Sequence, residues 1–278
     1  MDNQKKKMLE EKANQLRFDI IEMLCESGSG HPGGSLSMAD IFSYLYFSGE
    51  LKLDPKDPHK KDRDRVVLSK GHACPVLYAS LAESGYFDKS HLKTLRKLGS
   101  ILQGHPDMKK VPGVEMSTGS LGQGLSAAVG MALGLKLDGI DSYVYAIIGD
   151  GECDEGQIWE AAMAAAHYEL GNLIGILDRN GLQIDGFTKD IMNTEPMIDK
   201  WIAFRWKVIE IDAHNFDEID SAIKQAKAVK DSPVMIVANS IKGKGVSFME
   251  NECAWHGKAP SVEESERAKR EILSQKIY

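Results

Sequence analysis

The chain has 278 residues, of which 42% are apolar and 27% charged, a composition typical of a folded protein with a large core. The formal net charge of −7 gives no electrostatic reason to expect nucleic acid or an anionic membrane as a partner. No stretch of about eighteen or more residues is uniformly apolar, so we expect no membrane-spanning helix.

The four cysteines argue against a disulfide framework or a structural zinc site. Cys25, Cys74, Cys153 and Cys253 are far apart, and none forms a CxxC pair. The first twelve residues are mostly charged and lack the apolar core of a signal peptide. We therefore expect a cytoplasmic protein with reduced thiols.

The first part of the chain is predicted to be mainly helical. Apolar residues at helical spacing predict helices over residues 8–27 and 37–47. Residues 65–69 are predicted to form a short strand, and two further helices are expected over 75–84 and 89–98. The loops between these elements are rich in glycine, and two of them carry histidines.

A loop over residues 102–119 leads into a helix that is expected to end near residue 137. This helix is rich in alanine and glycine, and such small residues weaken a helix unless they serve another purpose. They allow another backbone or a ligand to approach closely, and simple close packing of helices explains them equally well.

The centre of the chain is predicted to be a strand–helix–strand unit. Residues 144–148 and 173–177 are short apolar runs typical of buried parallel strands, and 157–169 is an Ala-rich helix between them. Asp150 follows the first strand within Gly-Asp-Gly, and Asn180 follows the second. Because the strands are parallel, both side chains should lie at the same edge of the sheet.

That edge suits a metal ion and a diphosphate. Open α/β sheets bind ligands outside the carboxyl ends of their strands. The oxygens of Asp150 and Asn180 are hard donors of the kind that hold Mg²⁺ together with phosphate oxygens. The helix after Gly151 is expected to offer free N–H groups to the anion. The alternative is that Gly-Asp-Gly is only a tight turn, and the matching asparagine argues against it.

The rest of the chain continues the alternation of strand and helix. Strands are predicted over 207–211 and 234–238, with a helix over 216–229 between them and a terminal helix over 262–278. This alternation predicts an α/β fold with a doubly wound parallel sheet flanked by helices. The lysines of the turn at 241–245 could contact a phosphate, but lysines next to glycine are usually only solvated.

Four of the eight histidines share one context. They lie in loops beside glycine or proline: His31, His72, His105 and His256. The other four lie in polar or helical segments and are expected to be structural or solvated: His59, His91, His167 and His214. Intervals of 41, 33 and 151 residues fit no zinc site, so imidazoles converging on a polar substrate are the better interpretation.

Seven motifs in register resemble the diphosphate-binding half of a transketolase, over about residues 8–259. They are SGHPGG, SKGHA, GHP, TGSLGQG, GDGECDEGQIWEA, RNGLQIDG and WHG. The resemblance implies a thiamine diphosphate-binding fold, a single domain over 1–278, and thiamine diphosphate and Mg²⁺ as cofactors, with Ca²⁺ or Mn²⁺ able to replace Mg²⁺. Deoxyxylulose-phosphate synthases and ketoacid dehydrogenases share the GDG and NG motifs but match the histidine motifs less well.

The resemblance also implies a role for each motif residue. The metal ligands are Asp150, Asn180 and the carbonyl of Leu182. Those against the diphosphate are His72, Gly151 and His256, and those near the thiamine rings are Gly119 and Leu121. The residues that handle substrate protons are His31, His105 and His256, which suits imidazole. The acids that meet a neighbouring chain near the cofactor are Glu155 and Glu160.

A complete transketolase continues into a pyrimidine-binding domain, whereas this sequence ends at Tyr278. We therefore expect the first subunit of a split transketolase that acts on sugar phosphates, with a pyrimidine-binding partner in an α2β2 assembly. A component of a related thiamine enzyme is an alternative. A nucleotide- or metal-binding module without catalysis is another.

Overall fold

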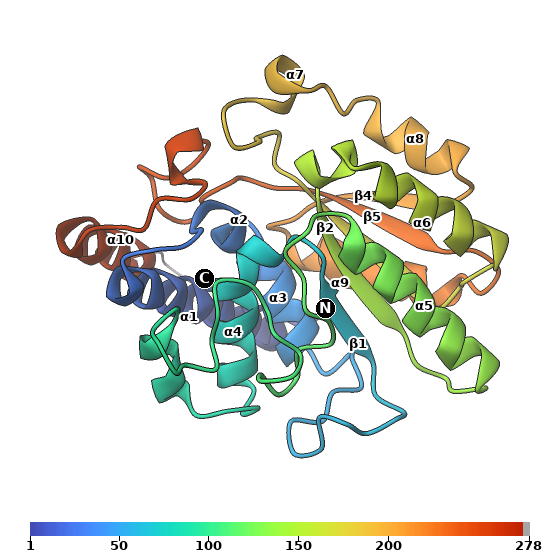
Figure 1. The fold of residues 1–278 in the computed structure, drawn as a ribbon, viewed down its shortest axis with the longest axis horizontal. Helices are drawn as coiled ribbons and strands as arrows, with labels where there is room; N and C mark the ends of the chain where they lie inside the picture. The colour runs from blue at the N-terminus through green and yellow to red at the C-terminus, as the bar shows by residue number, and fades with distance from the viewer. Residues whose placement is uncertain (275–278) are drawn as a thin grey trace.

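A five-stranded parallel sheet forms the centre of this computed structural model, which describes residues 1–274 (Figure 1). The strand order is β1-β2-β3-β5-β4, and every neighbouring pair is parallel. The strands are β1 (Arg65–Leu68), β2 (Val144–Gly149), β3 (Leu173–Arg179), β4 (Lys207–Asp212) and β5 (Val234–Asn239). All residues of β2 are buried, as expected for a parallel strand covered on both faces. The predicted fold class is confirmed.

Helices cover both faces of the sheet and create two cores. One core packs Tyr145 and Ile147 of β2 against α1 (Asn3–Ser27), α3 (Ala39–Phe47), α4 (Cys74–Glu83), α9 (Phe216–Ala228) and α10 (Val262–Ser274). The other packs Ala146 and Ile148 against α5 (Gln123–Leu137), α6 (Gly156–His167) and α8 (Met197–Ala203). Successive residues of β2 thus point to opposite faces, which is the geometry of a strand. Figure 1 shows α5 and α6 on one side of the sheet and α1 and α4 on the other.

Several predicted boundaries were wrong for local reasons. The first helix begins at Asn3 because the Asp2 side chain accepts a hydrogen bond from the Lys5 amide and caps it. The predicted helix over 37–47 is α3, which begins at Ala39, and a separate short helix, α2 (Gly33–Leu36), precedes it. The predicted helix over 89–98 is a 3₁₀ turn at Lys89–Thr94. Two helices lie between β3 and β4, where no helix was predicted: α7 (Thr188–Ile191) and α8. The last four residues of the predicted helix over 262–278 lie outside the described residues.

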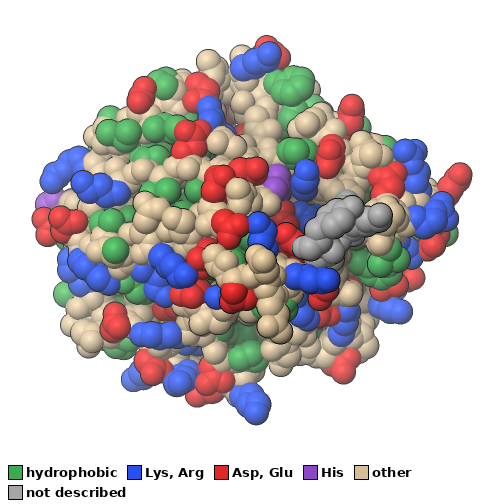
Figure 2. All heavy atoms as spheres, turned by 180° about the vertical axis from the view of Figure 1, so that it is seen from behind, with side chains coloured by type: hydrophobic (Ala, Val, Ile, Leu, Met, Phe, Trp, Pro, Cys, Tyr) green, Lys and Arg blue, Asp and Glu red, His purple; other side chains and the backbone are tan. Residues whose placement is uncertain are grey.

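The surface is mixed in charge, in line with the composition. Figure 2 shows Lys and Arg side chains interspersed with Asp and Glu over one face, with hydrophobic side chains scattered between them. Within residues 1–274, none of the helices combines the length and the apolar character needed to cross a membrane.

Two glycines of α5 have different surroundings. A Cβ added at Gly124 would lie 2.5 Å from the Cα of Ser69, so this glycine allows the helix to approach the chain just after β1. A Cβ added at Gly134 would have nothing within 4 Å. Close approach thus explains Gly124, whereas nothing in the described part of the chain packs against Gly134.

This difference gives a matched test of the packing. Gly124→Ala should lower the free energy of unfolding by about 1–3 kcal/mol, because the added methyl overpacks the contact with Ser69. Gly134→Ala on the same helix should leave stability unchanged or raise it by about 0.5–1 kcal/mol, since alanine is the better helix former. Urea unfolding followed by circular dichroism measures both variants. Equal stability of the two would show that α5 does not approach the Ser69 backbone closely.

Candidate active site

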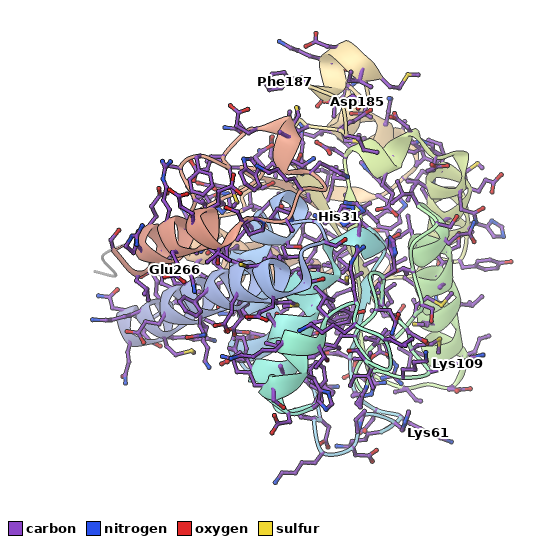
Figure 3. The ribbon with its side chains drawn as sticks, turned by 60° about the vertical axis from the view of Figure 1, so that its left-hand side comes forward. His31, Lys61, Lys109, Asp185, Phe187 and Glu266 are labelled. Carbon is purple, nitrogen blue, oxygen red and sulfur yellow. The ribbon has the colours of Figure 1, made fainter. Side chains whose placement is uncertain are left out.

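A cavity of about 360 Å³ opens at the carboxyl edge of the sheet, where loops after β1, β2, β3 and β5 meet. Figure 3 shows His31 near the centre of the molecule, and Asp185 and Phe187 on the loop that leads to α7. The predicted site residues that line the cavity are His31, His72, Gly119, Leu121, Asp150, Gly151, Asn180, Leu182 and His256. The predicted residues absent from its lining are His105, Glu155 and Glu160.

The ends of β2 and β3 bring Asp150 and Asn180 together, as the sequence predicts. One carboxylate oxygen of Asp150 accepts from the Gly181 amide at 2.6 Å, directly beside Asn180. The other accepts from the Gly151 amide at 2.8 Å. Gly151 begins a 3₁₀ turn, Gly151–Asp154, and α6 starts only at Gly156. The expected free N–H of Gly151 is therefore used within the chain, because the Asp150 side chain folds back to cap the turn.

Beneath these residues lies a buried ion pair that sequence reasoning missed. The carboxylate of Asp178, at the end of β3, pairs with Lys70, which follows β1. It also accepts from Ser37 at 2.8 Å, from the Asn180 amide nitrogen at 3.1 Å, and from Ser240. Burial raises the pKa of Asp178, but the charge of Lys70 and these hydrogen bonds outweigh burial and leave the pKa below its usual value.

Lys242 is a second buried cation, and the expectation that it is solvated was wrong. Only 3% of the residue is exposed. Its ammonium contacts the Leu182 carbonyl at 3.1 Å and Nδ1 of His256 at 3.0 Å. Burial lowers the pKa of Lys242, and the negative charges of Asp150 and Asp178 oppose that change. Lys242 lies in a Gly-rich turn, and nothing in the sequence of that turn indicates that the lysine is buried.

Three of the predicted histidines form a triangle at the cavity. The ring centroids lie 5.4 Å apart for His31 and His72, 5.5 Å for His31 and His256, and 5.1 Å for His72 and His256. Burial, together with nearby cations, lowers the pKa of His31 to about 4, of His72 to about 2 and of His256 to about 3. All three rings are therefore neutral near pH 7.

His105 lies just outside this triangle. A Cβ added at Gly119 would lie 3.2 Å from the His105 ring, so the two residues are in direct contact across the edge of the cavity. The His105 carbonyl accepts from the hydroxyl of Tyr78 at 3.1 Å. Burial and then the charge of Arg96 lower the pKa of His105. The structure thus places His105 beside a glycine that lines the cavity.

The acids after Gly151 divide into buried and exposed groups. Glu155 and Glu160 are exposed. Glu152, which sequence reasoning passed over, is buried and accepts from the amides of Gly122 and Gly149 at 2.8 and 3.0 Å. It therefore ties the loop before α5 to the end of β2. Cys153 is buried beside it, and burial raises the pKa of its thiol, which disfavours a reactive thiolate.

The donor set fits a hard cation better than zinc. Within residues 1–274, no three His, Cys, Asp or Glu side chains gather as metal ligands would. The cavity lining at this edge includes three oxygen-bearing groups that the sequence predicted as ligands: the carboxylate of Asp150, the amide of Asn180 and the carbonyl of Leu182. These oxygens match the preference of Mg²⁺, whereas zinc favours nitrogen and sulfur ligands.

Comparisons with known proteins agree on one family. Residues 8–275 match the family described as transketolase, thiamine diphosphate binding domain. The chain is 52% identical to SqwG, a 6-deoxy-6-sulfo-D-fructose transketolase subunit of Clostridium sp. (strain MSTE9), over 89% of this chain and 90% of that one. It is 41% identical to one of the subunits of an apulose-4-phosphate transketolase from Phocaeicola vulgatus, over 95% and 93% of the two chains.

Full-length transketolases match over less than half of their length. The human enzyme is 40% identical over 99% of this chain but only 43% of its own. The crystal structure of the Campylobacter jejuni transketolase superposes with a TM-score of 0.91 at 36% identity, covering all of this chain and 44% of that one. The predicted thiamine diphosphate-binding fold is thereby confirmed.

The neutral histidines predict how stability depends on pH in the cofactor-free chain. Their folded-state pKa values lie below the ordinary value of 6.5, so as pH falls below 6.5 the unfolded state takes up protons that the folded state does not. The free energy of unfolding should therefore fall, by up to about 1.4 kcal/mol per pH unit for each ring. His72→Gln should flatten this slope between pH 6 and 5 by about 1 kcal/mol per unit.

Urea unfolding at a series of pH values measures the slope. His59→Gln is the control, because His59 is exposed and its ring is solvated in both states. An unchanged slope in His72→Gln would mean that His72 is not held neutral by burial.

Proposed function

The chain belongs to the transketolase family, as its thiamine diphosphate-binding domain, and we propose that it is the first subunit of a split transketolase. The enzyme would move a two-carbon ketol unit from a ketose to an aldose, with a second polypeptide contributing the pyrimidine-binding half. One observation carries the proposal: two relatives that the chain matches over 90% and 93% of their length are named as transketolase subunits. Residues 1–278 would form one domain.

We assign Mg²⁺ to the oxygens of Asp150, Asn180 and the Leu182 carbonyl, and Ca²⁺ or Mn²⁺ can replace it. Burial, followed by the like charge of Asp178, raises the pKa of Asp150 to about 6. A divalent cation would offset the cost of keeping this carboxylate ionised. The Leu182 carbonyl already accepts from an ammonium group, which supports its assignment to a cation.

The diphosphate is assigned to the part of the cavity lined by His72, Gly151, His256 and Lys242. The ammonium of Lys242 offers a positive charge to an anion in this part, whereas the charge of Lys70 is compensated by Asp178. Gly119 and Leu121, on the loop before α5, would lie near the thiamine rings. When bound, thiamine diphosphate supplies the electron sink that carbon–carbon bond cleavage next to a carbonyl requires.

The histidines are assigned to substrate protons. His31 and His256 are neutral at pH 7, so each ring can accept a proton from a sugar hydroxyl at one nitrogen. Nδ1 of His31 is buried and has no hydrogen-bond partner among the described residues, which leaves it available to a polar group in the cavity. His105 lies beside Gly119 at the edge of the cavity and would be the third histidine to act on substrate protons.

The partner would cover the open side of the cavity. Ile184 and Ile191 line the cavity yet are 65% and 48% exposed, and Phe187 beside them is 49% exposed. Apolar side chains exposed together in this way commonly mark an interface. Glu155 and Glu160 are exposed and would face the same partner. Two copies of each chain, an α2β2 assembly, would satisfy the usual closed two-fold symmetry.

The substrates would be ketoses and aldoses that carry an anionic group, as sugar phosphates do. The relatives are named for 6-deoxy-6-sulfo-D-fructose and for apulose 4-phosphate, sugars that carry a sulfonate or a phosphate. Their names favour a specialised sugar over the common pentose phosphates. A panel of phosphorylated and sulfonated ketoses, offered to the reconstituted pair of subunits, would identify the donor.

Asp150→Ala should remove Mg²⁺-dependent binding of thiamine diphosphate to the assembled enzyme. Loss of a direct carboxylate ligand should weaken binding by at least about 100-fold, since even outer-shell partners of a metal are worth 10- to 100-fold. Isothermal titration calorimetry with and without Mg²⁺ measures the effect. Asp141→Ala is the control, because the Asp141 side chain is 90% exposed and lies before β2, at the opposite end of the strand. Equal cofactor affinity in both variants would remove Asp150 from the metal site.

The purified chain alone should have no ketol-transfer activity with thiamine diphosphate and Mg²⁺. Activity should appear when a pyrimidine-binding partner chain is added, and should saturate with the concentration of that partner. A coupled assay of aldose formation, together with light scattering of the mixture, measures activity and stoichiometry. Robust turnover by the chain alone would overturn the split-enzyme proposal.

A further inference from the structure

A histidine outside the cavity, His214, contacts the turn that carries Lys242. Its Nε2 accepts from the backbone amide of Ile241 at 3.0 Å. Its Nδ1 lies 2.7 Å from a carboxylate oxygen of Asp40. These two contacts fix the tautomer: Nδ1 carries the proton and Nε2 offers its lone pair. The side chain is only 13% exposed, so His214 is structural rather than solvated, as one half of the expectation had it.

The same carboxylate also reaches the other end of the turn. Arg17 of α1 donates to Asp40 of α3 at 2.5 Å, and its Nε donates to the Lys244 carbonyl at 3.2 Å. Asp40 is buried, and so is Arg17. Two side chains anchored on one buried carboxylate therefore bind the backbone on both sides of Lys242.

Two backbone hydrogen bonds also support the middle of the turn. The amide of Gly243 donates to the Gly33 carbonyl at 3.0 Å, and the Asn251 amide donates to the Lys242 carbonyl at 2.9 Å. A Cβ added at Gly243 would lie 2.3 Å from the Met249 carbonyl oxygen, and its φ of +81° favours glycine. The direction of the Lys242 side chain into the cavity follows from this fixed backbone.

We propose that His214 is a positioning residue for the cofactor: it fixes the turn from Ile241 to Lys244 and so aims Lys242 at the diphosphate. Asp40 and Arg17 act with it as the anchor. The inference rests on the proposed function, because it takes the anion in the cavity to be the diphosphate of thiamine diphosphate. It adds to that function a network of three side chains that lies outside the cavity lining.

The choice of variants follows from the chemistry of the imidazole. His214→Gln can still place an acceptor oxygen near the Ile241 amide, whereas His214→Leu cannot. In the assembled enzyme, His214→Leu should weaken Mg²⁺-dependent binding of thiamine diphosphate by about 10- to 100-fold, the usual cost of losing a supporting partner. His214→Gln should recover most of that loss. The apparent KM for the cofactor should change more than kcat at saturating cofactor.

A double-mutant cycle separates positioning from general destabilisation. If His214 acts through Lys242, then His214→Leu should cause no further loss of cofactor affinity in a Lys242→Met background. Amide hydrogen exchange of the cofactor-free chain gives an independent readout, since the Ile241 amide should exchange faster in His214→Leu than in His214→Gln. His167→Leu, an exposed histidine at the end of α6, is the control for both measurements.

Arg17→Lys is a second route should His214→Leu fail to fold. It keeps a positive charge beside Asp40 but loses the Nε donor to the Lys244 carbonyl, and it should also weaken cofactor binding without further loss in the Lys242→Met background. Wild-type affinity in both variants, or losses that simply add to that of Lys242→Met, would overturn the inference. Failure of the wild-type enzyme to bind thiamine diphosphate would instead overturn the proposed function.

Discussion

The buried pair of Lys70 and Asp178 is the interaction on which the site depends. Asp178 ends β3, Lys70 follows β1, and Ser37 and Ser240 bring the chain between α2 and α3 and the chain after β5 to the same carboxylate. Burying such a pair costs several kcal/mol per ion, and the attraction between the two charges together with this dense set of hydrogen bonds offsets the cost. Its effect is organisational: the carboxylate also holds the Asn180 amide nitrogen, which leaves the amide oxygen on the opposite side of the group.

Electrostatics sets the protonation states around the cavity. The three histidine rings are partly buried beside positive charges such as Lys242, and desolvation together with these charges disfavours protonation of the rings. The neutral rings fit the role that we propose for them toward the hydroxyl groups of a sugar, and Lys242 fits the role that we propose for it toward the diphosphate. Neutral imidazoles accept protons, whereas imidazolium groups would compete with the proposed metal ion for the same anion.

The sequence was sufficient for the features that periodicity controls. One apolar strand is followed by Gly-Asp-Gly and the next by Asn180. These two patterns predicted the parallel sheet and the proximity of Asp150 to Asn180. Long-range pairing was out of reach: nothing near Lys242 indicates that its turn is buried, and Asp178 looks like the polar end of an apolar strand. Local capping was also missed, since Asp150 uses the Gly151 amide that was expected to serve an anion.

The turn that carries Lys242 packs directly against the loops that carry His31 and His256. The Gly243 amide donates to the carbonyl of Gly33, two residues after His31. A Cβ added at Gly33 would lie 3.1 Å from both the Lys242 side chain and the Trp255 carbonyl, which directly precedes His256. The loops that carry the cation and two of the histidines are thus packed backbone to backbone. A shift of the Lys242 turn would therefore also displace His31 and His256, so the roles that we propose for the lysine and for the histidines depend on one shared geometry.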